Sequence, residues 1–282
     1  MKHIPVLLDA VMRALGDLSG RTIVDATFGA GGYSRAFLDA GARRVVAFDR
    51  DPNVLGDADA LKRDFSERFE FVPRPFSYIS ELDELYDAIV FDLGISSMQI
   101  DVASRGFSFR YDGPLDMRMS GDGISAADLI QRLDVDELAK ILRDYGDVKK
   151  SAGLARVIKD AGPKTTFELK ELVRNPRDVA PVFQALRIAV NDEMGQLVRA
   201  LDAVPNRLVM GGKCICVTFH SIEDRIVKNT FRNWVTPVGD PRLPVVAAAK
   251  FAPIKTAVPT DAEISNNPRA RSAHMRGVIK SY

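Results

Sequence analysis

Two short segments carry residues whose types and spacing suit a nucleoside cofactor. The first, Asp25-Ala-Thr-Phe-Gly-Ala-Gly-Gly-Tyr-Ser34, places an acid before a glycine-rich turn. The second, Phe48-Asp-Arg-Asp51, ends an apolar run in acidic residues. Glycines let a backbone approach a ligand closely, and a carboxylate about 20 residues further on can accept hydrogen bonds from two ribose hydroxyls. The two segments therefore predict a site for an adenosine-containing cofactor.

The glycine spacing discriminates between cofactors. A dinucleotide site favours G-x-G-x-x-G, but Ser34 stands where the third glycine would be, and the turn carries no basic residue for a pyrophosphate. Asp25, Gly29 and Gly31 instead fit acidic-x-x-x-G-x-G, which resembles motif I of Rossmann-like S-adenosylmethionine (AdoMet) methyltransferases. AdoMet has no phosphate, and Asp25 can face its ammonium group. An ordinary glycine-rich turn with a satisfied aspartate is the alternative, and Asp49 argues against it.

Strand and helix signals alternate over the first part of the chain. Asp51-Pro52 favours the opening of a helix, because proline suits the first helical turn. Such alternation predicts right-handed crossovers and a parallel sheet, with ligands beyond the carboxyl ends of its strands. The predicted strands are Thr22–Ala26, Arg44–Asp49, Phe69–Pro73 and Asp87–Leu93.

The pattern changes after Leu93. Residues 95–119 are rich in Gly, Ser, Asp and Arg, show no periodicity, and are too many for an ordinary connection, so we predict a functional loop. Residues 125–191 give helical signals alone, which predicts an all-helical insertion. The signals are capping boxes at Asp134-x-x-Glu137 and Thr165-x-x-Glu168, helix stops at Gly146 and Gly162, and Pro181 as the opening of a longer helix.

The α/β pattern then resumes. Residues 211–219 predict a strand, Ser221 is the expected N-cap of the next helix, and residues 237–260 predict a loop because they are rich in Pro, Ala and Val.

The predicted fold class is α/β, a Rossmann-like class I AdoMet methyltransferase domain with an inserted all-helical domain. The predicted domains are 1–103 with 192–282, and 104–191 as loop plus insertion for substrate recognition.

Composition is that of an ordinary globular protein of 282 residues, 46% hydrophobic and 27% charged. No apolar run approaches the ~18 residues of a membrane span, and Pro5 and Asp9 interrupt the N-terminal apolar stretch, so neither a membrane segment nor a signal peptide is predicted. Cys214 and Cys216 are the only cysteines and share one face of a predicted strand. We expect buried thiols in a reducing cytoplasm and no metal site.

The net charge of +1 conceals an uneven distribution. Residues 241–282 hold seven Lys and Arg against two acids, a local charge of +5 that leaves −4 for the rest. Such a basic segment suits phosphate, although a solvated surface fits the charge equally well. The basic residues are Arg242, Lys250, Lys255, Arg269, Arg271, Arg276 and Lys280.

Several longer motifs together resemble one family. The block Arg105-Gly-Phe-Ser-Phe-Arg-Tyr-Asp-Gly-Pro-Leu-Asp-Met-Arg-Met119 is the most specific of them. The chain resembles the RsmH/MraW family of bacterial 16S rRNA cytosine-N4 methyltransferases over nearly its whole length. The other matching motifs are His3-Ile-Pro-Val-Leu-Leu8, the glycine turn, Asp49-Arg-Asp-Pro52, Asp92-Leu-Gly-Ile-Ser-Ser97, Phe219-His-Ser-Ile-Glu-Asp-Arg225 and Asn267-Pro-Arg-Ala-Arg-Ser-Ala273.

The resemblance implies a substrate and a set of cofactor contacts. The expected reaction is methylation of the exocyclic amine of one cytidine in the decoding region of 16S rRNA, within the small ribosomal subunit. The family often has His where this chain has Tyr33, which leaves any imidazole contact in doubt. The implied AdoMet-binding positions are Gly31, Gly32, Tyr33, Asp49, Phe76, Asp92 and Gln99.

Asp92 is the candidate catalytic residue, because it ends the fourth predicted strand. A carboxylate that accepts from N4–H of cytosine would favour the pyramidal nitrogen that attacks a methyl group, and this chemistry needs no metal. An equally weighted alternative is that Asp92 only binds cofactor. His220 follows another strand end and ranks second, since a lone histidine is more often structural.

The basic and aromatic residues of the long loop suit RNA. Phe107 is placed to stack on an extruded base, while Arg105, Arg110 and Arg118 are placed to hold phosphates. A self-contained, salt-bridged loop is the alternative. Arg269 and Arg271 are further candidates for RNA contact, with a solvated turn as the alternative.

Other functions remain open at this point. The chain also fits a methyltransferase that acts on DNA, on another nucleic acid or on protein, and an AdoMet-binding ribosome-assembly factor without catalysis. The oligomeric state is open, with a homodimer as one option.

Overall fold

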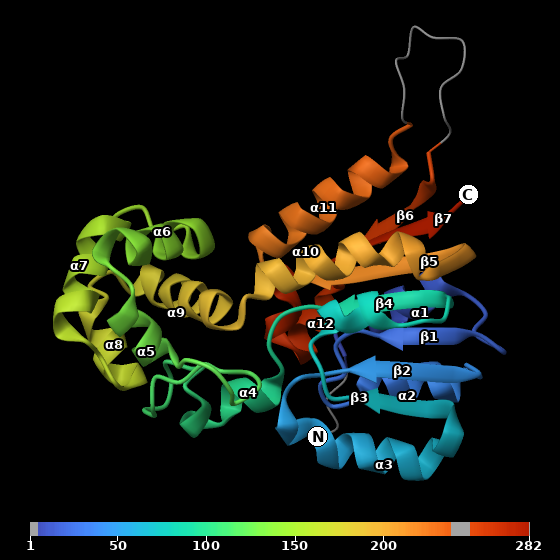
Figure 1. Cartoon of the computed structure of the whole chain (residues 1–282), viewed down its shortest axis with the longest axis horizontal. Helices are drawn as coiled ribbons and strands as arrows, with labels where there is room; N and C mark the ends of the chain where they lie inside the picture. The colour runs from blue at the N-terminus through green and yellow to red at the C-terminus, as the bar shows by residue number, and fades with distance from the viewer. Residues whose placement is uncertain (1–4, 238–248, 282) are drawn as a thin grey trace, which may run out of the picture. The chain divides into compact units, whose positions relative to one another are not determined.

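The computed structural model describes residues 5–237 and 249–281. The chain forms two compact units, which we call unit 1 (residues up to Gly94 and from Gln196 onward) and unit 2 (Ile95–Gly195) (Figure 1). The predicted insertion, 104–191, lies wholly inside unit 2. His3 of the N-terminal motif and Arg242 of the basic segment lie outside the described residues.

A seven-stranded sheet forms the centre of unit 1. Its strands are β1 (Thr22–Asp25), β2 (Arg44–Phe48), β3 (Phe69–Val72), β4 (Tyr86–Asp92), β5 (Leu208–Thr218), β6 (Phe251–Ala257) and β7 (His274–Lys280). The order is β3-β2-β1-β4-β5-β7-β6, in which β1 to β5 are mutually parallel and β7 is antiparallel to both of its neighbours. The α/β class and the first four strands were predicted correctly, each end within one residue.

The prediction of a loop over 237–260 was wrong, because β6 lies inside it. Pro253 is one of the prolines on which the loop prediction rested, and it lies within β6. It lies opposite Val278 of β7, on the strand that forms the edge of the sheet. Proline is tolerated on an edge strand because its missing N–H removes no hydrogen bond to a further neighbour.

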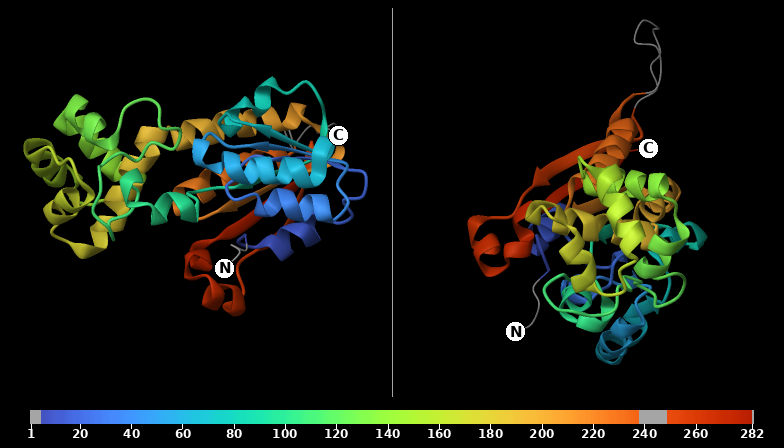
Figure 2. Two further views of the ribbon diagram at one scale, coloured as in Figure 1. Left: turned by 90° about the horizontal axis from the view of Figure 1, so that it is seen from below. Right: turned by 90° about the vertical axis from the view of Figure 1, so that its left-hand side faces the viewer.

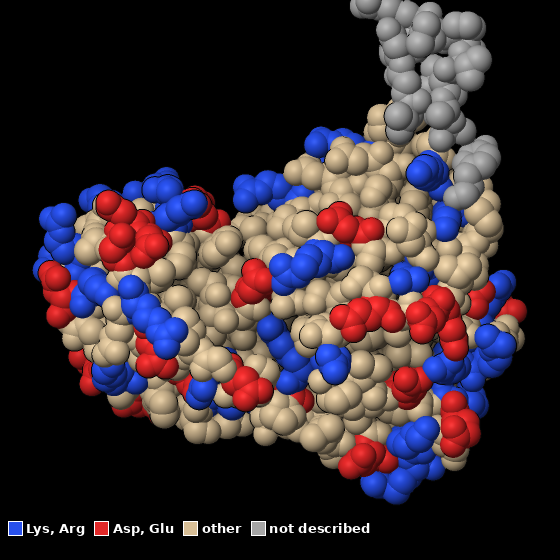
Figure 3. Space-filling view, in the orientation of Figure 1, with Lys and Arg blue, Asp and Glu red and all other residues tan. Residues whose placement is uncertain are grey.

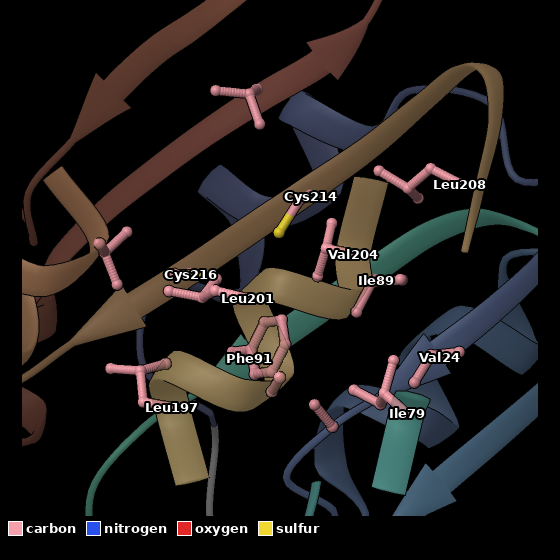
Figure 4. Packing of buried hydrophobic residues seen from close by; sticks show 14 of the residues in the cluster. Val24, Ile79, Ile89, Phe91, Leu197, Leu201, Val204, Leu208, Cys214 and Cys216 are labelled. Atoms are coloured by element: carbon pink, nitrogen blue, oxygen red, sulfur yellow. The ribbon is translucent and has the colours of Figure 1, made fainter. Parts of the chain in front are cut away.

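Helices cover both faces of this sheet (Figure 2). On one face, Leu197 and Leu201 pack with Val24, Ile89 and Phe91 in a core that Figure 4 shows at close range. Cys214 and Cys216 lie in this core as predicted, fully buried. Burial of each such aliphatic or aromatic side chain contributes about 1.5–3 kcal/mol. The helices are α1 (Leu8–Leu15), α2 (Gly32–Asp39), α3 (Leu55–Phe65), α10 (Glu193–Ala203), α11 (Ser221–Val235) and α12 (Asp261–Asn266), and the 3-10 turns are η1 (Pro52–Val54), η2 (Ser66–Arg68), η3 (Phe76–Glu81), η5 (Val204–Asn206) and η6 (Pro268–Ser272).

Unit 2 is helical, as predicted. Asp134 and Thr165 each accept from a backbone N–H in the capping boxes that the sequence indicated, and Gly162 ends a helix with φ 56°. The expected helix opening at Pro181 was wrong: the helix begins at Pro176, behind the N-cap Asn175. The elements are α4 (Ser97–Asp101), η4 (Ala103–Arg105), α5 (Ala126–Arg132), α6 (Val135–Gly146), α7 (Ser151–Ala161), α8 (Thr166–Leu172) and α9 (Pro176–Asn191).

Among residues 5–237 and 249–281, no helix combines the length and the apolar composition that a membrane span requires.

Candidate active site

The glycine turn lies where the direction of strand addition reverses. From β1 the sheet grows through β2 to β3 on one side, and through β4 to β5 on the other. Open parallel sheets bind ligands at the carboxyl ends of the strands flanking this point. The turn is hydrogen-bonded to the two strands that flank β1. Ala26 N–H donates to the Val90 carbonyl of β4 and Phe28 N–H to the Phe48 carbonyl of β2, each at 2.8 Å.

Two glycines of the turn adopt left-handed backbone conformations. Gly29 has φ 53° and Gly31 has φ 74°. A Cβ at Gly31 would also lie 2.9 Å from the Phe28 ring. Both positions therefore favour glycine, and at Gly29 the space that a Cβ would face is open to 4 Å.

Asp49 holds the turn from the end of β2. One carboxylate oxygen accepts from Gly29 N–H and the other from Asp51 N–H, each at 2.9 Å. Burial raises the pKa of Asp49, while these two hydrogen bonds act in the opposite direction. The structure thus brings Gly29 and Asp49 together, as their spacing in the sequence suggested.

Asp25 fixes the turn from the end of β1. Its oxygens accept from the Ser34 hydroxyl at 2.6 Å and from Thr27 N–H at 3.2 Å, and its side chain is buried. Burial raises the pKa of Asp25 to about 6, and the two hydrogen bonds limit the rise. Ser34, which replaces the third glycine of a dinucleotide motif, is therefore a partner of Asp25. The proposed contact of Asp25 with an ammonium group stays a prediction.

Asp92 ends β4 with one carboxylate oxygen unpaired. Its backbone N–H donates to Thr27 Oγ1 at 2.7 Å, whereas Oδ1 is buried and accepts no hydrogen bond from any residue that the structure describes. Burial raises the pKa of Asp92 well above its ordinary value, and the nearby charges of Asp25 and Glu223 add to the rise. A buried, unpartnered carboxylate oxygen costs free energy in folding. Such a group is a candidate for contact with a ligand.

Tyr33 joins the turn to the N-terminal segment. Its ring is buried, and its hydroxyl donates to the Val6 carbonyl at 2.5 Å. Burial raises the pKa of Tyr33, with smaller contributions from the charges of Asp92 and Asp25. Pro5 lies so close to Gly32 that a Cβ there would come within 2.4 Å of its ring. The tyrosine that departs from the family pattern therefore contacts the chain itself.

We expect Tyr33→Phe to lower the free energy of unfolding by about 1–3 kcal/mol, because the buried Val6 carbonyl loses its donor. Denaturant unfolding measures this change. Tyr111→Phe is the matched control, since the side chain of Tyr111 is exposed. Equal stabilities of the two variants would contradict the role assigned to the Tyr33 hydroxyl.

His220 is the N-cap of α11, a role that the sequence assigned to Ser221. Its Nδ1 accepts from Glu223 N–H at 3.4 Å, and Glu223 Oε2 accepts from Phe219 N–H at 2.8 Å. His220 Nε2 lies 3.0 Å from Glu223 Oε1, an ion-pair distance without a directed hydrogen bond. Histidine is an unusual cap, so sequence reasoning missed both this capping box and the buried Glu223. These contacts support the structural alternative for His220.

Phe76 packs against the core of unit 1. It begins η3, and its ring meets Phe91 edge to face with centroids 5.8 Å apart. Gln99 belongs to unit 2, where its Oε1 accepts from Ser96 N–H at 3.1 Å in the capping box of α4. The cofactor contacts of both residues stay predictions.

The long loop of unit 2 is held by its own side chains. Arg105 donates to the carbonyls of Arg118 and Met119 at 3.0 and 2.9 Å. Arg118 donates to both carboxylate oxygens of Asp116 at 2.9 and 2.7 Å. Burial acts to raise the pKa of Asp116, but these bonds outweigh it and lower the pKa. These contacts fit the alternative given for this segment, a self-contained loop held by its own salt bridges.

Phe107 requires a correction. Its ring is 6% exposed and belongs to the hydrophobic core of unit 2, so it offers no free face for an extruded base in this conformation. Arg110 is exposed.

Arg269 and Arg271 are exposed on η6. This turn precedes β7, whose first residue, His274, lies opposite Thr218 at the carboxyl end of β5. Because β7 is antiparallel to β5, η6 lies at the edge of the sheet where β1 to β5 end. The position of the two arginines at this edge thus follows from the antiparallel direction of β7. The sequence around them did not indicate that direction.

Comparison with known proteins decides the family. The family model described as MraW methylase matches residues 1–281. The chain belongs to this family. A ribosomal RNA small subunit methyltransferase H from Chelativorans sp. (strain BNC1) is 45% identical over 99% of this chain and 87% of its own length. The protein of that name from Rickettsia canadensis (strain McKiel) is 42% identical over 99% of this chain and 98% of its own length. A crystal structure titled as an rRNA methylase from Streptococcus thermophilus aligns with a TM-score of 0.48 at 13% identity, covering 100% of this chain and 99% of that one.

Membership in a methylase family supports the prediction of AdoMet as cofactor. Within the described residues, no group of three or more His, Cys, Asp and Glu side chains is arranged to hold a metal ion.

Proposed function

We propose that the protein transfers a methyl group from AdoMet to the exocyclic N4 of a cytidine in the decoding region of 16S rRNA, with the small ribosomal subunit as substrate. The family and the names of the relatives support rRNA methylation. The observation that carries the proposal is the buried, unpaired Oδ1 of Asp92 beside the glycine turn.

The residues present fit the proposed cofactor. The left-handed Gly29 leaves open space beside the backbone, and Asp49, which accepts from Gly29 N–H, offers a carboxylate that suits ribose hydroxyls. Gly31, Gly32 and Asp49 would hold the nucleoside part, and Asp25 and Asp92 supply negative charge toward its cationic groups. When bound, AdoMet supplies a methyl group made electrophilic by a positively charged sulfur.

Asp92 then acts on the amine that receives the methyl group. The lone pair of N4 is delocalised into the cytosine ring and becomes nucleophilic only as the nitrogen pyramidalises. A carboxylate oxygen that accepts from N4–H favours that geometry and takes the proton that nitrogen loses. No residue among 5–237 and 249–281 donates to Oδ1, which leaves this oxygen free to accept. Because Oδ1 is buried, it is shielded from bulk water, which strengthens the interaction.

The RNA is held from outside the pocket. Arg269 and Arg271 lie at the ligand edge of the sheet, where phosphates next to the target nucleotide would pass. Arg105 and Arg118 are engaged within the loop of unit 2, which makes them supports of the loop rather than phosphate contacts. Arg110 remains exposed for such a contact.

Replacing Arg269 and Arg271 with glutamine should weaken substrate binding and flatten its salt dependence. Each lost phosphate contact lowers the slope of log K against log salt by about 0.7 for single-stranded RNA. Binding of unmethylated small subunits across a salt series measures the slope. Unchanged affinity and slope would remove η6 from the RNA contacts.

One experiment tests the function and its main rival. Small subunits that lack the modification are incubated with AdoMet labelled on its methyl group, and the rRNA is digested to nucleosides. Label in N4-methylcytidine supports the proposal. Tight binding of the subunits without label supports an assembly factor, and label in another nucleoside supports a different methyltransferase.

A further inference from the structure

Helix α11 presents an unusual surface. Its exposed residues carry positive charge or neutral polar groups and include no acid. They are Ser221, Arg225, Lys228, Asn229, Arg232 and Asn233. Arg225 ends one of the motifs that resemble the family, and the cofactor site does not use it. We call this set of six residues the α11 stripe.

The acids of α11 are turned away from the stripe. Glu223 is buried, and Asp224 accepts from Arg276 of β7 at 2.7 and 2.9 Å. Both acids are therefore occupied at the inner face of the helix. Along the stripe, Arg225 and Lys228 have no ion-pair partner among the described residues, while Arg232 donates to Asn229 Oδ1 at 2.8 Å.

Spacing aligns the stripe along one side of the helix. Positions 225, 228, 229 and 232 follow the three- and four-residue spacing that places helical side chains on one face. Figure 3 shows blue side chains and no red along the upper margin of unit 1, where α11 runs in Figure 1. By contrast, α3 exposes three acids, Asp57, Asp59 and Asp64, as well as Lys62 and Arg63, which is the mixed pattern of a solvated helix.

The stripe begins close to the candidate active site. Helix α11 starts directly after the carboxyl end of β5, and Glu223 in its first turn is near enough to raise the pKa of Asp92. From there the helix runs back along the sheet, in contact with β5, β6 and β7. The stripe thus extends from the rim of the site along the flank of unit 1.

We propose that the α11 stripe binds the phosphate backbone of the RNA substrate on its path away from the active site. Arg, Lys, Ser and Asn side chains are the usual donors to phosphate oxygens, and the absence of acids removes repulsion. The contacts read charge and not base identity, so they contribute affinity and register. This inference rests on the proposed function, and it adds a surface that the loop of unit 2 and η6 do not include.

The test compares two double variants with equal loss of charge. Lys228→Gln with Arg232→Gln removes the centre of the stripe. Arg13→Gln with Arg63→Gln removes two exposed charges from the last turns of α1 and α3. Those turns lie toward the opposite edge of the sheet, because each precedes the start of a parallel strand.

We expect the stripe variant to bind unmethylated small subunits about tenfold more weakly at physiological salt, with a salt slope lower by about 1.4. Its AdoMet affinity and its rate at saturating subunits should match wild type, and the control variant should match wild type in every respect. An equal loss in both variants, or no loss in the stripe variant, overturns the inference. If the wild-type protein itself leaves the rRNA unmethylated, the proposed function fails. That result differs from both binding outcomes that would overturn the inference about the α11 stripe.

Discussion

Asp92→Asn should slow methyl transfer by about 10²–10⁴-fold, the contribution expected of a group that accepts the proton from the reacting nitrogen. The amide keeps the size of the side chain but presents a weaker acceptor to N4–H. Asp92→Ala should abolish transfer, and both variants should still bind small subunits, because the RNA contacts lie elsewhere. Single-turnover rates at saturating AdoMet and subunits measure the chemical step. Asp83→Asn, at an exposed acid before β4, is the control.

Near-normal turnover in Asp92→Asn would reduce Asp92 to a cofactor contact. The pH profile gives an independent reading. Burial raises the pKa of Asp92, so the accepting carboxylate form is lost as pH falls through that raised value. The wild-type rate should therefore climb with pH at values well above the ordinary range for aspartate. The rising limb should be absent in Asp92→Asn, and a profile shared by both proteins would contradict the assignment.

Asp49→Ala should weaken AdoMet binding by at least about 100-fold. The carboxylate is placed to accept from two ribose hydroxyls, and a hydrogen bond to a charged group contributes about 1.5–3 kcal/mol. The variant also frees Gly29 N–H, which Asp49 holds at 2.9 Å. Titration calorimetry with AdoMet measures the loss.

Asp49→Asn separates the two effects. An amide oxygen can still accept from Gly29 N–H, but it offers the ribose a weaker acceptor, so affinity should fall between wild type and Asp49→Ala. Asp57→Asn, on the exposed side of α3, controls for the removal of one negative charge. If Asp49→Ala retains wild-type affinity, the nucleoside does not lie at the end of β2.

The fold was predictable where short apolar runs and local helix caps indicated the elements that the structure contains. The strands β1, β2 and β4 are short apolar runs that end in an acid or directly before one, and β3 ends directly before Pro73. Asp134 and Thr165 are ordinary caps. Prediction failed where tertiary contacts override local preference. Pro253 is accepted in β6 because β6 is the edge strand of the sheet that the described residues form. His220 displaces Ser221 as cap because Glu223 bonds back to the start of the helix.

The site was predictable in part. Gly29, Gly31 and Asp49 belong to one sequence pattern, and the structure joins Gly29 to Asp49 by a hydrogen bond. The buried state of Phe107 depends on the packing of unit 2, which its alternating sequence context does not reveal. Thr27 was missed because its partner, Asp92, is distant in sequence. Glu223 was missed because it accepts from Phe219 N–H in a capping box whose N-cap is a histidine.

The position of β7 has a consequence for biosynthesis. During translation β6 emerges before β7, yet among the described strands β6 pairs with β7 alone. Until residues 274–280 leave the ribosome, β5 therefore presents a bare hydrogen-bonding edge, a surface that invites aberrant pairing with other nascent chains. A premature stop codon ahead of these residues would leave that edge permanently uncovered, and aggregation is the outcome to expect of such a truncated product.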